Sequence, residues 1–499
     1  MTTALDRAAP ASEKADPGFR GSHAARWWVL VVLGVAQLMV TLDATVVNIA
    51  LPAAQQDLAF SDGDRQWVIT GYALAFGSLL MLGGRLGDLF GRRATFLIGL
   101  LGFAIASGIG GAAGNFEILV AARVGQGVFA ALLAPAALSL LTVTFTEPSE
   151  RAKAFGIFSA LSGAGAAIGL LLGGMLTEWA SWRWVMFVNI GFAGLALVGG
   201  VLLLAKHVAS ERPKLDIPGT LVASAGLFAI VYGFSHVEST SWTDPVALGF
   251  LIGGAVLLAA FVGVEARVAH PLLPLRLVAD RTRGGSFLAV FVMGMGMFSI
   301  FLFLTYYLAV TLGYSPIKAG VAFLPMVASI VVSSVIVPSA LLPRVGPKVV
   351  LSISFLVSAA GMILLAQLGL DSGFTAGVMP GLILLGVGLG GVMTTAFQGA
   401  TAGVHHEDAG VASALINTSQ QVGGSISTAL LTTVATSAMT DYLSSHKAGP
   451  LTMAQAHVEG YTATFWWGAG IFVAGAIIAA IVVPNSALAP SEGEAVIAH

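Results

Sequence analysis

The sequence predicts an all-α polytopic membrane protein whose chain crosses the bilayer fourteen times. Hydrophobic residues make up 57% of its 499 residues, charged residues make up only 10%, and the mean hydropathy is +0.89. Runs of about 20 apolar residues recur along the chain, and each is long enough to cross a hydrocarbon core of about 30 Å as a helix. Helices are expected because a lipid-exposed segment must satisfy its own backbone hydrogen bonds.

The composition excludes several classes of function. The net charge of −2 and the lack of a basic stripe give no electrostatic basis for binding nucleic acid. Because the chain has no cysteine, it has no disulfide framework, thiolate metal site or cysteine nucleophile. Glycine is abundant, at 62 residues, which indicates closely packed helices in a membrane bundle.

Fourteen apolar spans follow one another, separated by charged residues or by breaks that contain Pro and Gly. Their approximate limits are 27–50, 66–84, 94–113, 116–142, 154–176, 184–205, 217–235, 245–264, 287–311, 318–340, 349–370, 376–400, 410–437 and 462–483. The predicted regions are a cytoplasmic N-terminal tail (1–26), an N-terminal six-helix bundle (27–205), two additional helices with a cytoplasmic linker (206–286), a C-terminal six-helix bundle (287–483) and a C-terminal tail (484–499).

The distribution of Lys and Arg predicts the orientation. An even number of spans places both termini on one side, and the segments of that side hold 18 of the 23 Lys and Arg residues. The opposite side holds four, Arg65, Arg183, Lys318 and Lys447, and Arg123 lies inside a span. Because positive residues accumulate on the cytoplasmic side, we expect both termini in the cytoplasm and the protein in the cell membrane.

The connection between spans two and three carries a concentrated charge motif, Gly84-Arg85-Leu86-Gly87-Asp88-Leu89-Phe90-Gly91-Arg92-Arg93. Four of these ten residues are charged, so we expect a very short loop at the membrane surface in which the glycines permit a tight turn. A weaker version of the same motif, residues 339–348, follows span ten. Both motifs follow the second helix of a six-helix set, which predicts that the two sets are repeats.

Span one contains a carboxylate, Asp43, which costs about 2.5–3.5 kcal/mol on insertion scales and therefore seldom persists without a partner or a cavity. One interpretation is a structural residue wetted from the outer end of its helix. The other is a group that takes up and releases a proton, because burial favours the protonated form of a carboxyl group and a nearby cation favours the ionised form.

The natural cation is Arg123 in span four. At 1.5 Å per residue, Asp43 lies about 24 Å from the inner end of its span and Arg123 about 10 Å from the outer end of its own, so both fall in the outer half. Gln126, three residues later, makes a polar face with Arg123 that points inward. The alternative is an arginine that extends to the membrane surface.

Span five carries glycines at a spacing of four, Gly165, Gly169 and Gly173, followed by Gly174. This spacing predicts a smooth face along which another helix can approach and slide, and ordinary helix packing is the alternative. At the outer end of span six, Trp182–Asn189 forms an interfacial aromatic anchor with a polar Asn beyond it.

Together these motifs resemble the fourteen-helix drug:proton antiporter family of the major facilitator superfamily, over nearly the whole chain. The matching positions are Gly84, Gly87, Asp88, Gly91, Arg92 and Arg93 in the loop, Leu42, Asp43, Thr45, Val46, Val47, Asn48 and Pro52 in span one, Arg123, Gln126 and Gly127 in span four, Trp182–Asn189, and Gly410–Thr418 with Gln421, Gly423 and Gly424. The resemblance implies that Asp43 and Arg123 couple transport to protons and that the loop gates the inner side. It also implies a monomer that exports small amphipathic drugs or antibiotics by alternating access, with the proton gradient and no cofactor as its energy source.

Two departures from the family pattern affect these expectations. The fifth-helix motif usually has Gly-Pro before its final Gly-Gly, whereas Gly169 is followed here by Leu170, which leaves the direction of exchange open. Gly191 stands where the sixth-helix motif usually has proline. The second half has no acid within a predicted span, so we expect neutral, monocationic or zwitterionic substrates.

A substrate pocket is expected between the two halves near the bilayer midplane. Span nine supplies Met297 and Phe301, since methionine adapts its shape and aromatic rings offer stacking area, although these side chains could equally face lipid or neighbouring helices. The polar candidates for this pocket are Gln37, Asn48, Trp67, Tyr72, Gln126, Gln398, Asn417 and Gln421.

Other functions are weaker alternatives. A specific exporter of one natural product or metabolite has the same sequence features as a multidrug exporter. A membrane-embedded enzyme lacks support, because no H-E-x-x-H or G-x-S-x-G motif at a strand–helix turn is found. A transport-dead sensor would not need both Asp43 and Arg123. His405–Asp408 lies in a predicted loop, so we predict no metal site there.

Overall fold

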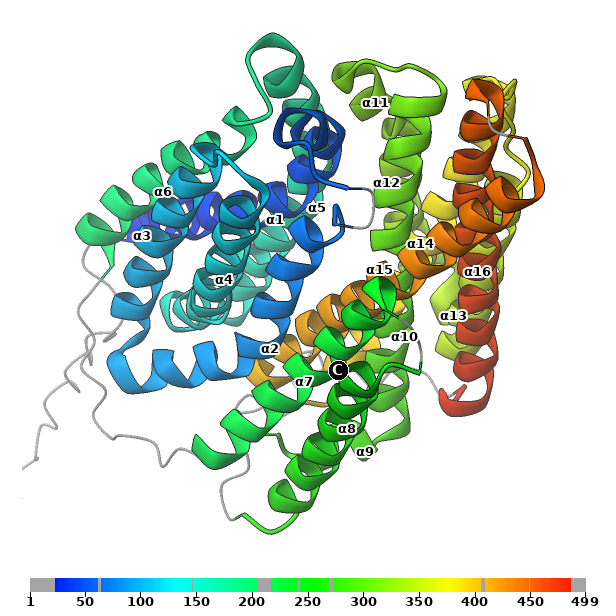
Figure 1. Cartoon of the computed structure of the whole chain (residues 1–499). Helices are drawn as coiled ribbons and strands as arrows, with labels where there is room; N and C mark the ends of the chain where they lie inside the picture. The colour runs from blue at the N-terminus through cyan, green and yellow to red at the C-terminus, as the bar shows by residue number, and fades with distance from the viewer. Residues whose placement is uncertain are drawn as a thin grey trace, which may run out of the picture.

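The computed structural model describes residues 23–61, 64–145, 147–204, 217–240, 243–268, 273–404, 409–447 and 449–485. The first half, on the left of Figure 1, contains α1 (His23–Leu58), α2 (Trp67–Phe90), α3 (Arg92–Gly111), α4 (Phe116–Thr144), α5 (Pro148–Trp179) and α6 (Trp184–Leu203). A hairpin of α7 (Ile217–Ser239) and α8 (Pro245–Glu265) and the short α9 (Leu275–Ala279) follow.

The second half, on the right of Figure 1, is built of longer helices interrupted by π-helical turns (η). Its elements are α10 (Arg281–Ser299), η1 (Ile300–Leu304), η2 (Tyr307–Thr311), α11 (Pro316–Ala322), α12 (Leu324–Ile336), η3 (Val337–Leu341), α13 (Leu342–Leu365), η4 (Phe374–Val378), α14 (Met379–Thr401), α15 (Ala409–Ser445) and α16 (Pro450–Val482).

The helices agree with the predicted spans. Ten helical runs are long and apolar enough to cross a membrane by length and composition, and three shorter apolar helices lie within α2, α5 and α7. One run, Pro316–Leu365, contains two predicted spans joined across a kink at Gly346. Each predicted span therefore coincides with a helical segment in the described part of the chain, and the protein is a multi-pass membrane protein.

Several predicted boundaries are wrong because helices continue beyond their apolar windows. α1 extends to Leu58 through Pro52, and α16 begins at Pro450, twelve residues before the predicted start of span fourteen. An apolar window marks only the part of a helix that crosses hydrocarbon, whereas polar residues outside that layer still form backbone hydrogen bonds.

Helix packing repeats between the two halves. In the first half α1 packs on α5 and α6, α3 on α4 and α6, and α2 on α4. In the second half α10 packs on α15 and α16, α13 on α14 and α16, and α12 on α14. Each pair in one half thus has its counterpart in the other, which confirms two pseudo-symmetric six-helix bundles.

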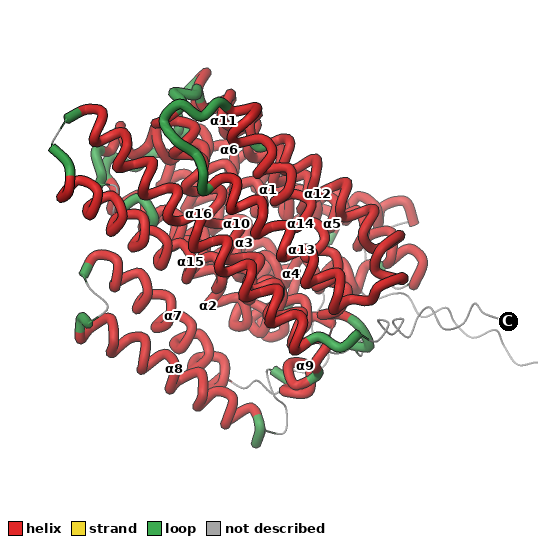
Figure 2. The backbone as a smooth tube through the Cα atoms, turned by 90° about the vertical axis from the view of Figure 1, so that its right-hand side faces the viewer, coloured by secondary structure: helices red, strands yellow, loops and turns green. Residues whose placement is uncertain are grey.

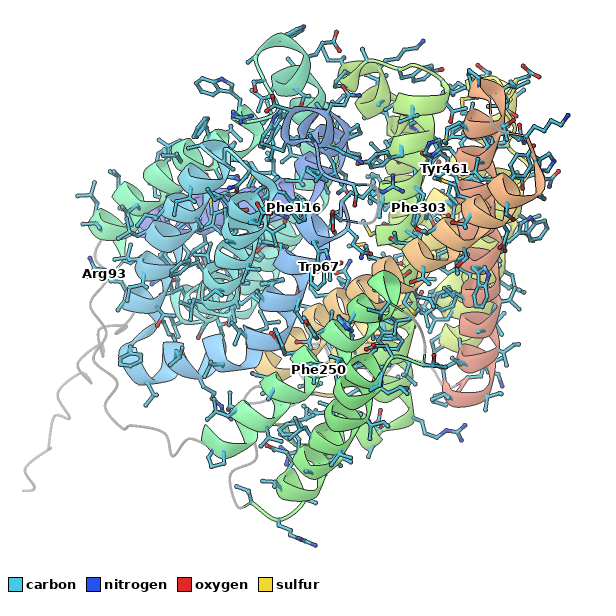
Figure 3. The ribbon with its side chains drawn as sticks, in the orientation of Figure 1. Trp67, Arg93, Phe116, Phe250, Phe303 and Tyr461 are labelled. Carbon is cyan, nitrogen blue, oxygen red and sulfur yellow. The ribbon has the colours of Figure 1, made fainter. Side chains whose placement is uncertain are left out.

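The two additional helices form a unit of their own at the edge of the bundle (Figure 2). α7 packs on α8 and also on α2 and α15, so it lies over the line where the two halves adjoin. Tyr232 of α7 contacts both Trp67 of α2 and Phe250 of α8, with ring centroids 6.2 Å and 4.6 Å away. Trp67 and Phe250 are labelled in Figure 3. The hairpin is therefore attached to the first half through an aromatic contact.

The connection between α2 and α3 is shorter than predicted. Residues 84–90 continue α2, and Arg92 already begins α3, so the prediction of a ten-residue loop is wrong. Gly91 alone makes the turn, with φ 91° and ψ 131°. Gly346 occupies the corresponding place between η3 and the main part of α13, with φ 77°. A single glycine in a conformation closed to other residues reverses the chain in both repeats.

We expect Gly91→Ala to lower the free energy of unfolding by about 1–3 kcal/mol, because a Cβ atom is strained at this positive φ. The control is Gly87→Ala, since Gly87 lies in the helical part of the same motif and an added Cβ there has nothing within 4 Å. Thermal unfolding of the purified variants measures both. Equal stability of the two variants would contradict the role of Gly91.

The two halves meet at the end of the bundle where α1 ends and α2 begins, called here the α1–α2 end. Tyr306, between η1 and η2, donates a hydrogen bond of 2.6 Å to Gln55 of α1, and the Arg65 guanidinium lies 4.1 Å from the centre of the same ring. Glu178 of α5 accepts from the backbone N–H of Ile317 at 3.1 Å. One hydrophobic core contains residues of both halves, so the halves also pack directly against each other.

Candidate functional site

The site is a buried ion pair between two helices. Asp43 of α1 and Arg123 of α4 are 0% and 1% exposed, and the arginine Nη1 lies 2.6 Å from the aspartate Oδ2. Their contact agrees with the similar depths predicted from the sequence. A buried pair of this kind contributes little net stability, but it becomes costly when one partner is removed.

Neutral side chains from α4 and α6 complete the coordination of Asp43, and one of them is held in turn by a serine of α3. Its Oδ1 accepts from Gln126 Nε2 at 2.9 Å and from Asn189 Nδ2 at 2.7 Å. Gln126 also accepts from Arg123 at 2.8 Å and donates to Ser107 Oγ at 2.8 Å. Asp43 therefore accepts three hydrogen bonds, and all five side chains are buried.

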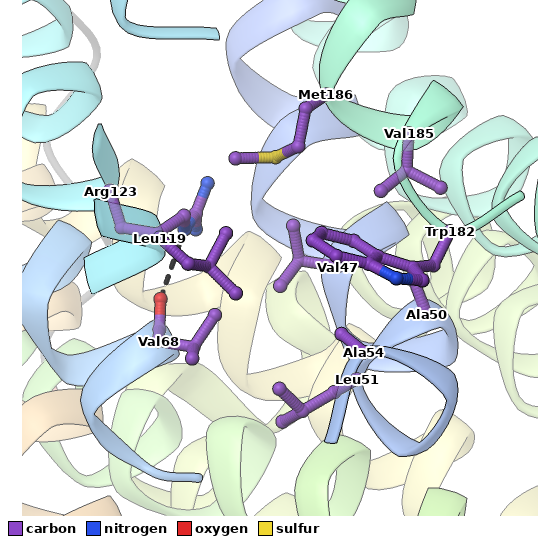
Figure 4. A pocket seen from close by; sticks show the side chains of 10 residues that line it. All are labelled: Val47, Ala50, Leu51, Ala54, Val68, Leu119, Arg123, Trp182, Val185 and Met186. Atoms are coloured by element: carbon purple, nitrogen blue, oxygen red, sulfur yellow. Dashed lines mark hydrogen bonds between the residues drawn. The ribbon is translucent and has the colours of Figure 1, made fainter. Parts of the chain in front are cut away.

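Arg123 is held by two further contacts. Its Nε donates to the carbonyl oxygen of Val68 at 2.9 Å, drawn as a dashed line in Figure 4, and its guanidinium lies 4.5 Å from the centre of the Tyr72 ring. A small cavity adjoins it. Its lining is otherwise apolar, as Figure 4 shows.

The network forms a polar layer between two hydrophobic cores. Along α1, Val40 belongs to a core of the first half and Leu42 to the core shared by both halves, with Asp43 next to it. Along α6, Met186 belongs to the shared core and Ala193 to the first-half core, and Asn189 lies between them. The ion pair is thus isolated from water by apolar layers on both sides, which strengthens its electrostatic interaction.

Glycines allow the helices around the site to approach closely. The predicted glycine face of α5 lies against α1, because a Cβ added at Gly169 would overlap Thr45 and one added at Gly173 would lie 2.8 Å from Val46. On another side of α5, a Cβ added at Gly320 of α11 would overlap the carbonyl of Leu170. α5 therefore contacts both the helix that carries Asp43 and the second half.

A second ion pair lies at the α1–α2 end. Asp57 of α1 pairs with Arg183 and accepts from Trp182 Nε1 at 3.0 Å. Arg183 also donates to the carbonyl of Ala113 at 2.8 Å. Both ionic side chains are partly exposed, so solvent screens this pair more than the buried one. The aromatic anchor predicted at the start of span six is tied to α1 through Asp57.

The described contacts of the predicted substrate-binding residues lie in several places. Tyr72 and Gln126 belong to the ion-pair network. Gln421 of α15 lies against α2 at Gly77, and Gln398 is exposed. The remaining candidates are spread over separate contacts: Gln37 near Thr41, Asn48 on the carbonyls of its own helix, Trp67 near Tyr232, Phe301 near Phe323, Met297 near Gln420, and Asn417, which is half-buried.

The remaining predicted residues lie away from the ion pair or outside the described residues. Arg93 of the 84–93 motif donates to the carbonyl of Val201 at 3.0 Å, which links the start of α3 to the end of α6. The Asp88 side chain and His405–Asp408 lie outside what the structure describes. Among the described residues, no three His, Asp or Glu side chains are grouped as metal ligands.

Sequence reasoning missed Ser107 and the contact of Asn189 with Asp43. A serine in an apolar span often bonds to its own helix, so Ser107 gave no signal. Asn189 did give a signal in the sequence, because a carboxamide in hydrocarbon needs a hydrogen-bond partner. Its partner lies 146 residues away in the sequence, and no local pattern identifies it.

Comparisons with known proteins add independent findings. Residues 33–428 match the family model described as Major Facilitator Superfamily. A puromycin resistance protein of Streptomyces alboniger is 49% identical over 475 residues, covering 95% of this chain and 94% of that protein. A cephamycin export protein of Amycolatopsis lactamdurans is 39% identical over 408 residues, covering 81% and 84%. A bacterial homologue of the human lysosomal transporter Spinster shares the fold, with a TM-score of 0.63, 17% identity and coverage of 93% and 98%.

Proposed function

Because the chain belongs to the major facilitator superfamily, we propose that it is a proton-coupled secondary transporter that exports small amphipathic drugs or antibiotics across the cell membrane. The relatives named for puromycin resistance and cephamycin export support this class of substrate. The proton gradient supplies the energy, without a further cofactor, and the protein is not an enzyme. We expect it to act as a monomer in the lipid bilayer.

The observation that carries the proposal is the buried contact between Asp43 and Arg123. A carboxylate enclosed by apolar cores stays ionised only while a cation and hydrogen-bond donors hold it. If α1 moves away from α4, the carboxyl group loses the cation and the protonated form is favoured. The movement of one helix can thus bind or release one proton.

α5 offers a route from this site to the second half. Its glycine face contacts α1 next to Asp43, and Leu170 contacts Gly320 of α11. A shift of α1 would therefore be transmitted through α5 to the α1–α2 end, where the two halves meet. We propose that proton binding at Asp43 changes the balance between conformations open to opposite sides, as alternating access requires. The 84–93 motif gates the other end in this proposal.

We further propose that both termini lie in the cytoplasm and that the α1–α2 end faces outside. The excess of Lys and Arg on the segments of the terminal side supports this orientation. Reporter fusions at each end of the chain test it. A C-terminal fusion active only outside the cytoplasm would overturn the orientation.

The export function is tested in a bacterium that lacks its own efflux pumps. Expression of this chain should raise the concentration of puromycin that the cells tolerate, and a broad compound panel shows which other molecules are exported. Unchanged susceptibility to every compound, with the protein present in the membrane, would overturn the proposal.

A specific exporter of one natural product is the second candidate. The names of the two relatives each refer to a single antibiotic or antibiotic class, which favours a narrow substrate range. The same panel separates the two candidates. Protection against one chemical class supports the specific exporter, and protection against unrelated classes supports the multidrug exporter.

A further inference from the structure

Asn189 uses only one end of its carboxamide in the buried network. Its side chain is 0% exposed, and its Nδ2 donates to Asp43 Oδ1 at 2.7 Å. Its Oδ1 is buried without a hydrogen-bond partner. Val185 and Met186, about one turn earlier on α6, line the small cavity beside Arg123 (Figure 4). A buried polar atom without a partner is costly, so its presence at this position calls for an explanation.

Gln126 provides the contrast. Its Oε1 accepts from Arg123, and its Nε2 donates to both Asp43 and Ser107. A rotation of this carboxamide would break the hydrogen bond from Arg123 and place Nε2 against the guanidinium, so Gln126 is held with its Nε2 toward Asp43. Asn189 uses only one end of its carboxamide, and its rotation would break a single hydrogen bond.

A carboxamide can serve both protonation states of a neighbouring carboxyl group. An ionised carboxylate only accepts hydrogen bonds, whereas a protonated carboxyl group also carries an O–H donor. The terminal torsion of asparagine has a broad twofold preference, so rotation exchanges Nδ2 and Oδ1 at low cost. The end of Asn189 that now lacks a partner would then face Asp43.

We propose that Asn189 is a positioning residue that follows the protonation of Asp43. Its Nδ2 donates to the ionised carboxylate, and its Oδ1 accepts the O–H of the protonated carboxyl group after rotation. The proton stays on Asp43 in both arrangements. This inference rests on the proposed proton coupling, because it assumes that Asp43 binds the transported proton.

Few charged or titratable groups of the described residues lie near Asp43. α4 contributes Arg123, and α2 contributes Tyr72, whose ring faces that arginine. α3 and α6 contribute the neutral Ser107 and Asn189, and α5 faces the neighbouring turns of α1 with Gly169 and Gly173. Asp57 and Arg183 pair with each other at the α1–α2 end. The protonation of Asp43 is therefore sensitive to a change of its neutral donors.

The test is a pH titration of the purified protein followed by infrared spectroscopy. The C=O band of a protonated carboxyl group that is lost in Asp43→Asn identifies Asp43. In Asn189→Leu the ionised form loses a charge-assisted hydrogen bond and the protonated form loses a weaker neutral one. The midpoint should therefore move to higher pH by about one unit.

Asn48→Leu is the matched control, because Asn48 is another buried carboxamide of the same half that donates to backbone carbonyls of α1 and not to Asp43. It should leave the midpoint unchanged. If Asn189→Leu does not fold, Asn189→Ala replaces it, since it also removes both polar atoms. An unchanged midpoint in the Asn189 variant overturns the role of Asn189. If no band of the wild-type protein titrates and depends on Asp43, the proposed coupling site is wrong instead.

Discussion

Asp43→Asn is expected to abolish proton-driven export while the protein still folds and reaches the membrane. Asparagine has nearly the shape of aspartate but cannot carry the proton. Arg123 would keep its hydrogen bonds to Val68 and Gln126 and its contact with the Tyr72 ring, so the remaining cation is not left without partners. The loss should therefore appear in transport rather than in protein yield.

Inverted membrane vesicles with an imposed pH gradient measure this effect as gradient-driven uptake of puromycin. The matched control is Glu117→Gln, which makes the same chemical change at an exposed acid in the first turn of α4. Wild-type uptake is expected from the control and uptake at the background level from Asp43→Asn. Gradient-driven uptake by Asp43→Asn equal to that of the wild type would move the coupling site elsewhere.

Arg123→Met should lower the free energy of unfolding by up to about 3–5 kcal/mol at pH values where Asp43 stays ionised, because the buried carboxylate loses its cation, and the loss should shrink at low pH, where the carboxyl group takes up a proton. Methionine has a similar length and is apolar, so the loss reports the missing charge more than a missing volume. Arg123→Lys keeps the charge but not the planar fork. We expect this variant to lose transport only in part. Thermal unfolding of the purified variants measures the stability.

The double variant Asp43→Asn with Arg123→Met separates charge from packing. It removes both ions, and replacement of a whole buried pair by neutral groups is often close to neutral for stability. The double variant should therefore recover most of the stability lost in Arg123→Met, yet it should not transport. Arg183→Met is the control, since its pair with Asp57 is partly exposed and should matter much less. A double variant as unstable as Arg123→Met would contradict the electrostatic explanation.

The pairing of Asp43 with Arg123 could be predicted because the membrane limits the choices. An ion in a hydrocarbon layer needs a partner, and depth along a helix follows from residue number. These two residues are the acid and the base that the sequence places away from the ends of the predicted spans, at similar depths. Few other pairings satisfied both conditions, and the structure places the two side chains in contact.

The partners of that pair were not predictable in the same way. Neutral side chains such as Ser107 and Asn189 occur often in membrane helices, and their partner depends on how each helix is rotated about its axis. Rotation is set by packing against neighbours, as at Gly169 against Thr45, rather than by hydropathy.

The sequence by itself determined the all-helical, multi-pass architecture, the repeat of two six-helix sets and the pairing of Asp43 with Arg123. All three follow from the requirement that a hydrocarbon layer contain apolar helices with satisfied backbones. Only the tertiary structure decided that Gly91 alone turns the chain between α2 and α3, that α5 contacts both halves, and that three neutral or charged donors converge on Asp43. Such contacts depend on side-chain shapes at helix crossings, which join residues far apart in the chain and leave no periodic pattern in the sequence.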